Sequence, residues 1–143
     1  MALYTFADIE AAIRASWGAD TCDPVDLHLW TPETPSRGQC GVTSMTLQDL
    51  IGGDLLEAEV HFVDGTLQGH HYWNRLVGGL ELDLTRDQFV DSEVVGPPTA
   101  LERLAPLPNR LAEQYILLRT RVGAHLGLDS WPEWVPSGPQ SPR

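Results

Sequence analysis

Apolar residues recur at helical spacing in three segments of the chain, which predicts three helices. The first covers residues 5–17, where Thr5 followed by Asp8 has the spacing of a capping box. The second covers residues 40–50 and the third residues 109–126. The apolar residues of the first segment share one helical face: Phe6, Ile9, Ile13 and Trp17.

A different pattern, apolar and polar residues in alternation, occupies the middle of the chain. Residues 57–63 form the first predicted strand, in which Ala58, Val60 and Phe62 alternate with polar residues, and residues 69–76 and 80–84 are the next two. Asp64-Gly65 and Gly78-Gly79 between them are typical hairpin turns. The pattern therefore predicts an antiparallel meander of three strands.

The remaining segments are rich in proline and glycine. Residues 18–39 are predicted to form a functional loop, because this stretch delivers the chain to Cys40. Residues 99–104 are predicted to form one or two helical turns. A single domain is expected over residues 1–128, followed by a proline-rich tail at residues 129–143.

Composition and charge narrow the possible functions. The 143 residues suit one compact domain, and the formal net charge is −11 with no lysine in the chain. So acidic a chain is expected to bind neither nucleic acid nor an anionic membrane, and Schiff-base chemistry on lysine is excluded. The two cysteines, Cys22 and Cys40, make no disulfide framework, and no apolar run suggests a signal peptide or a membrane span. A cytoplasmic protein is the expectation.

The candidate chemistry lies at Cys40, His71 and Asp83, which fall on a helix start and on two neighbouring strands. A helix N terminus carries partial positive charge and is expected to lower the pKa of a thiol. A nearby imidazole can take the thiol proton, and a carboxylate can fix the tautomer of that imidazole. The Gly78-Gly79 turn is expected to bring the second and third strands together and place His71 near Asp83. Strand alternation alone does not choose between His71 and His70.

Three short motifs occur in the order seen in papain- and transglutaminase-like enzymes: Gly38-Gln39-Cys40, His71-Tyr72-Trp73 and Asp83-Leu84-Thr85. Through its RGQC and HYWNRL…DLTRDQF stretches the chain also resembles the YunG-like family of small bacterial proteins. The resemblance implies an α+β, papain/transglutaminase-like fold, with a small antiparallel sheet, a Cys-bearing helix packed on it and a long C-terminal helix. It also selects His71 over His70 and implies a Cys40, His71, Asp83 triad.

The chain departs from the motif of these enzymes at the position after the cysteine, where Gly41 replaces the usual tryptophan. Gly41 is expected to let a substrate approach the helix start closely. The backbone N–H of Cys40 is the first candidate oxyanion donor, with Gln39 or Trp30 as a second. Trp73 is expected either to line the cleft or to belong to the core.

These observations predict a cysteine-dependent acyltransferase or hydrolase. It would act on an amide, ester or thioester of a small molecule or peptide, without a cofactor or metal. A non-catalytic binding module on the same fold is the first alternative. A metalloenzyme using His61, His70 and His71, which a hairpin could bring together, is the second.

Overall fold

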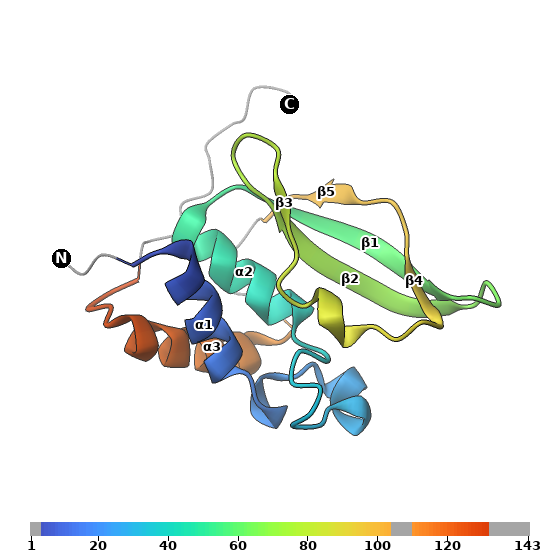
Figure 1. The fold of residues 1–143 in the computed structure, drawn as a ribbon, viewed down its shortest axis with the longest axis horizontal. Coiled ribbons are helices and arrows are strands. Elements are labelled where there is room, and N and C mark those ends of the chain that lie inside the picture. Colours follow the sequence, from blue (N-terminus) through green and yellow to red (C-terminus); the bar gives the residue numbers. More distant parts are fainter. Residues whose placement is uncertain (1–3, 104–109, 132–143) are drawn as a thin grey trace.

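The structure is a computed structural model that describes residues 4–103 and 110–131, and Figure 1 shows its elements. It is a mixed α+β fold. Most of the predicted proline-rich tail lies outside the described residues. The elements in chain order are α1 (Phe6–Ser16), η1 (Ala19–Thr21), η2 (Pro24–Leu29), α2 (Cys40–Ile51), β1 (Asp54–Phe62), β2 (Leu67–Arg75), β3 (Glu81–Leu82), η3 (Arg86–Gln88), β4 (Glu93–Val95), β5 (Thr99–Leu101) and α3 (Ala112–Leu126).

The first helix, α1, begins at the predicted capping box. The backbone N–H of Thr5 donates to Asp8 at 2.7 Å, and the backbone N–H of Asp8 donates to Thr5 Oγ1 at 3.2 Å. These two bonds satisfy donors that the helix itself leaves without partners. Ile9 and Ile13 on its apolar face are buried, whereas Phe6 at its start is 40% exposed and stays outside the core.

The sheet is built around the long β1–β2 hairpin, and its strand order is β3-β2-β1-β4, with β5 also pairing with β1. The predicted meander is confirmed for β1, β2 and β3. The third strand is shorter than predicted, because only Glu81 and Leu82 pair with β2 before the chain turns away. The expectation of helical turns at residues 99–104 is wrong. Residues 99–101 form β5, because Thr99–Leu101 pair with Leu55–Glu57 on the second edge of β1.

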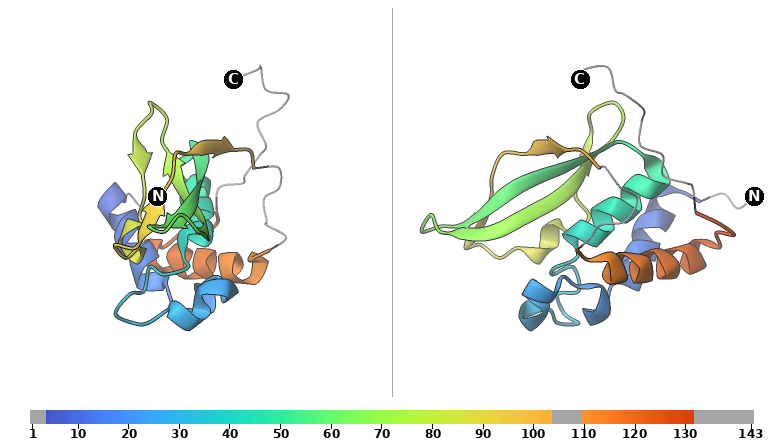
Figure 2. Two further views of the ribbon diagram at one scale, coloured as in Figure 1. Left: turned by 90° about the vertical axis from the view of Figure 1, so that its right-hand side faces the viewer. Right: turned by 180° about the vertical axis from the view of Figure 1, so that it is seen from behind.

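The three helices gather beside one end of the hairpin, and its Asp64-Gly65 turn projects away from them (Figure 1). Figure 2 shows α2 between the sheet and α3, while α1 packs against α3. Among the described residues, no helix is long and apolar enough to cross a membrane. The main core lies between the helices and consists of Ile9, Ala12, Ile13, Trp17, Val42, Leu47, Leu84, Tyr115, Leu118, Val122 and Leu126.

Helix α3 starts later than the predicted residue 109, at Ala112. Leu111 before it has a φ of 69°, a left-handed conformation that an L-residue adopts at a cost of about 1–2 kcal/mol. Its side chain faces the start of α2, since a Cβ added to Gly41 would lie 3.2 Å from Leu111 Cδ1. The beginning of α3 therefore packs directly beside the residue that follows Cys40.

Candidate active site

His71 and Asp83 form a close pair at the edge of the sheet. His71 is on β2 and is fully buried, and its Nε2 lies 2.7 Å from Asp83 Oδ2. Asp83 directly follows β3, so the β2–β3 pairing sets the separation of the two residues. The other carboxylate oxygen of Asp83 accepts the backbone N–H of Thr85 at 3.3 Å. The structure thus brings together two of the three predicted catalytic side chains.

The imidazole of His71 is clamped between two aromatic rings. Its ring stacks on Trp73 at 5.3 Å and meets the edge of Phe89 at 4.7 Å. The carboxylate of Asp83 accepts a hydrogen bond, so Nε2 carries the hydrogen and Nδ1 of the neutral ring is a bare acceptor. Nδ1 is buried, and no hydrogen-bond partner for it is present in the described structure. A buried polar atom without a partner is unusual and favours a functional role.

Cys40 is the first residue of α2, and it contacts β2 at Tyr72, the residue after His71. The backbone N–H of Tyr72 donates to its sulfur. Part of the surface of Cys40 is exposed, but its thiol is desolvated. This burial raises the pKa of the thiol to about 12, and the carboxylates of Asp83 and Asp26 raise it further. The hydrogen bond from the Tyr72 N–H acts in the opposite direction. The expectation of a lowered pKa from the helix N terminus is therefore wrong. Desolvation of the thiolate outweighs the helix dipole.

The sulfur of Cys40 and the ring of His71 are not hydrogen-bonded to each other, because His71 Nε2 is bonded to Asp83 and Nδ1 has no partner. With its pKa near 12, the thiol is protonated at neutral pH. The resting Cys40 is therefore a neutral thiol that makes no hydrogen bond to His71.

A tight turn at Gly38 positions Cys40. Gly38 has a φ of 72°, and a Cβ there would lie 2.4 Å from the sulfur of Cys22, so only glycine fits. Its carbonyl accepts the backbone N–H of Asp23 at 2.9 Å, and its N–H donates to Gln88 Oε1 at 3.2 Å. The turn is thus fixed to two other segments just before α2 begins.

Gln39, predicted as an oxyanion donor, is fully buried with its amide already bonded at both ends. Its Nε2 donates to the carbonyl of Gly18 at 3.0 Å, and its Oε1 accepts from Thr21 Oγ1 at 2.8 Å. The Gln39 side chain therefore ties η1 to the start of α2. An oxyanion role for this side chain would require both bonds to break.

The other predicted substrate-contacting tryptophans are also engaged. Trp30 Nε1 donates to the carbonyl of Pro35 at 3.1 Å. Trp73 is buried and packs with other residues of the sheet, so of its two expected places it belongs to the core. Its indole N–H donates to Glu81 at 2.8 Å. The side chain of Gln39, the N-cap residue of α2, makes no capping hydrogen bond. The backbone N–H groups of its first turn, at Cys40 and Gly41, therefore remain the best-placed donors for an oxyanion.

The β1–β2 register separates the histidines of the metal alternative. His61 pairs with Leu67, while His71 pairs with Ala58. His61 Nε2 instead lies 3.5 Å from Glu59 Oε2. Over residues 4–103 and 110–131, no group of three or more potential metal ligands is found.

Phe89, the residue that follows η3, contacts the His71 ring and was not among the predicted site residues. The signal that could have found it is its place six residues after Asp83, at the end of the DLTRDQF stretch. Tyr72 was missed as well, because its contribution comes from its backbone, and sequence patterns describe side chains.

Comparison with known proteins identifies one family. The profile described as YunG protein matches residues 5–127. The chain is also 34% identical over 119 residues to a Bacillus subtilis (strain 168) protein described as "Uncharacterized protein YunG", and the alignment covers 82% of this chain and 91% of the relative. No solved structure matches significantly.

Proposed function

The chain belongs to the YunG family, and we propose that it is a cysteine-dependent acyltransferase or hydrolase with Cys40 as nucleophile, His71 as base and Asp83 as the residue that orients the base. One observation carries the proposal. The buried imidazole of His71 is bonded to Asp83 through Nε2, and its Nδ1 has no hydrogen-bond partner. The next residue on the strand, Tyr72, donates its backbone N–H to the Cys40 sulfur. Such a ring is oriented to receive a proton.

The raised pKa of Cys40 decides how the first step would run. A protonated thiol attacks a carbonyl poorly, so its proton must leave as the bond between sulfur and carbon forms. His71 Nδ1 takes that proton, and Asp83 stabilises the resulting imidazolium through Nε2–H. Binding of the acyl substrate has to bring Sγ and Nδ1 into contact, as catalytic hydrogen bonds often tighten only in the complex.

The remaining steps follow from proton balance. The imidazolium of His71 returns its proton to the leaving amine, alcohol or thiol as the tetrahedral intermediate collapses, which leaves an acyl group on Cys40. Water or an amine then attacks this thioester, again losing a proton to His71, and Cys40 regains its thiol. The N–H groups of Cys40 and Gly41 are the proposed oxyanion donors.

The order of elements supports a papain/transglutaminase-like arrangement as part of the proposal. A cysteine begins a helix, a histidine lies on a strand that this helix packs against, and an aspartate follows the neighbouring strand. A reducing, cytoplasmic setting would keep both cysteines as free thiols. The proposed substrates are acyl compounds of a small molecule or peptide.

An activated ester tests the proposal. Incubation of the protein with p-nitrophenyl acetate is expected to give a burst of p-nitrophenol close to one equivalent, followed by slower turnover. Cys40→Ser is expected to abolish the burst. Cys22→Ser is the matched control and should retain it, because the Cys22 thiol donates to the carbonyls of Asp23 and Arg37 and lies outside the proposed triad. An equal burst in wild type and Cys40→Ser would overturn the proposal.

A non-catalytic binding module is the second candidate, and a specific observation favours it: the Cys40 thiol is protonated and makes no bond to His71. In that case His71 and Asp83 serve stability alone. Absence of any burst, together with a lower melting temperature in Asp83→Asn, would support this candidate.

A further inference from the structure

A second site lies on the other side of the Gly38 turn, where η2 faces the segment that carries η3 and β4. A cavity of about 560 Å³ opens there. Its walls combine exposed apolar side chains with a larger number of polar and charged ones. The apolar lining residues are Val25, Leu29, Phe62 and Val90.

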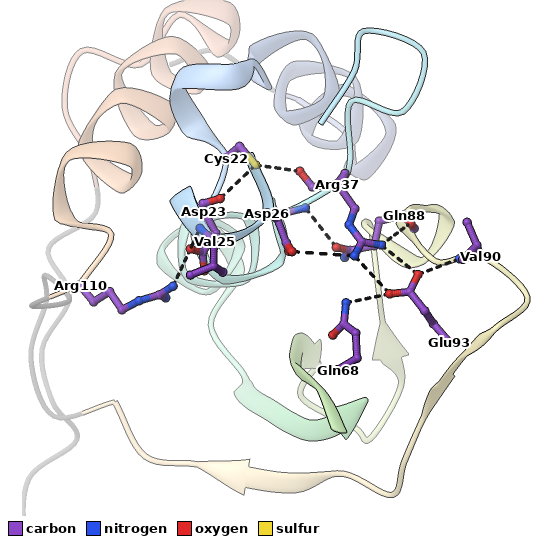
Figure 3. Close-up of polar contacts among 11 residues, drawn as sticks. Cys22, Asp23, Val25, Asp26, Arg37, Gln68, Gln88, Val90, Glu93 and Arg110 are labelled. Atoms are coloured by element: carbon purple, nitrogen blue, oxygen red, sulfur yellow. Dashed lines mark hydrogen bonds and ion pairs between the residues drawn. The ribbon is translucent and has the colours of Figure 1, made fainter. Parts of the chain in front are cut away.

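The polar floor of this cavity is dominated by one buried ion pair (Figure 3). Arg37, whose side chain is 8% exposed, binds Glu93 with both terminal nitrogens, at 2.9 and 3.2 Å. Glu93 also accepts from Gln68 at 2.7 Å, and Arg37 donates to the carbonyl of Gln88. The guanidinium and the carboxylate therefore neutralise each other in a bidentate pair, although Arg37 Nε is buried without a hydrogen-bond partner.

Asp26 is the carboxylate that this pair leaves under-neutralised. Its closest cation is Arg37 Nη2, at 3.8 Å, and its side chain is 26% exposed toward the cavity. His28 also lines the cavity. With this histidine counted as neutral, the carboxylates of Asp26 and Glu93 and the guanidinium of Arg37 give the cavity one net negative charge. Burial raises the pKa of Asp26 even though Arg37 opposes this shift, as expected for a carboxylate short of partners.

We propose that this cavity binds an organic ammonium ion with an apolar body, its charge on Asp26 and its body between Leu29 and Val90. The ligand would place a cation closer to Asp26 than Arg37 is, and it would cover apolar surface that is now exposed. The net charge of −11 adds a long-range attraction for cations. Neither Cys40 nor His71 lines the cavity, although the Asp26 carboxylate adds to the raised pKa of the Cys40 thiol.

Isothermal titration calorimetry with hexylammonium chloride tests this proposal, with sodium hexanoate as the anion of equal chain length. Saturable binding of hexylammonium and no binding of hexanoate are expected. Asp26→Asn keeps the shape of the side chain and is expected to raise the Kd about tenfold. Asp129→Asn, an exposed residue outside the cavity, is the matched control and should leave the Kd unchanged.

Two further variants distinguish the site from a general charge effect and from the active site. Leu29→Ala removes part of an exposed wall, so it should weaken binding without unfolding the protein. Cys40→Ala should bind hexylammonium as wild type does. Tighter binding of hexanoate, absence of hexylammonium binding, or an equal Kd in Asp26→Asn with an unchanged circular dichroism spectrum would each overturn the proposal.

Discussion

At the scale of single residues, the chemistry of the candidate site depends on where each side chain is desolvated. His71 is fully buried, but its one bond to Asp83 and its two aromatic neighbours hold the ring in a defined orientation. Cys40 meets the same low-polarity surroundings without a cation beside it, and its pKa rises instead of falling. The motif order predicted the His71–Asp83 pair, because strand register fixes it. It could not predict the pKa of Cys40, because burial is a property of the packed molecule.

The carboxylate of Asp83 is predicted to act through His71. Asp83→Asn keeps the shape of the side chain but lets an amide face Nε2, which permits the wrong imidazole tautomer. We expect kcat for p-nitrophenyl acetate to fall by about 10²- to 10⁴-fold, with a small change in KM. Asp91→Asn, on the exposed loop before β4, is the control. Unchanged kcat in Asp83→Asn would remove Asp83 from the mechanism.

The protonated state of Cys40 gives a specific pH profile. Because its pKa is raised to about 12, the thiolate fraction grows with pH throughout the range below that value. The rate of Cys40 alkylation by iodoacetamide is expected to increase steadily from pH 6 to pH 10, without an acidic plateau. A rate that is already maximal at pH 5 would instead indicate a preformed ion pair with His71.

At the scale of elements, the sequence predicted those with enough periodicity to be recognised. The capping box of α1 and the two central strands follow from local pattern. The short strands β4 and β5 do not, because three residues carry no period, and these segments become strands only by pairing with β1. Residues 18–39 were predicted as a loop, yet η1 and η2 form within them and their contacts fix the turn before Cys40.

The Gly38 turn is predicted to be essential for positioning α2. Gly38→Ala combines a left-handed φ with a clash against the Cys22 sulfur, so we expect a loss of about 2–4 kcal/mol in unfolding free energy. Gly65→Ala is the matched control, since Gly65 also has positive φ but no atom within 4 Å. It should lose only about 1 kcal/mol. Urea denaturation measures both, and equal losses would show that the contact with Cys22 is unimportant.

At the scale of the whole molecule, several buried acids share one direction of pKa shift. Burial raises the pKa of three groups to about 12: the thiols of Cys22 and Cys40 and the phenol of Tyr115. The carboxylates of Asp26 and Asp23 add to the shift at Cys22. A hydrogen bond to Asp49 adds to the shift at Tyr115. The folded state therefore holds these protons more tightly than the unfolded state does. Their contribution to stability is complete below the unfolded pKa values, near 8.5–10, and is lost as pH rises toward 12.

Unfolding free energy is accordingly expected to decrease steeply between pH 8.5 and pH 10.5. Urea denaturation at intervals of half a pH unit measures the slope. Cys22→Ser removes one of the titrating groups and should make the slope shallower. A flat stability profile across this range would contradict the assigned direction of the shifts.

The central claim is tested most directly by finding the site of acylation after reaction with p-nitrophenyl acetate. Peptide mass spectrometry of the quenched protein should locate a single acetyl group on Cys40, and His71→Gln should greatly reduce its yield while its circular dichroism spectrum stays native. Acetyl groups only on other residues, or equal acetylation of Cys40 in His71→Gln, would contradict the account.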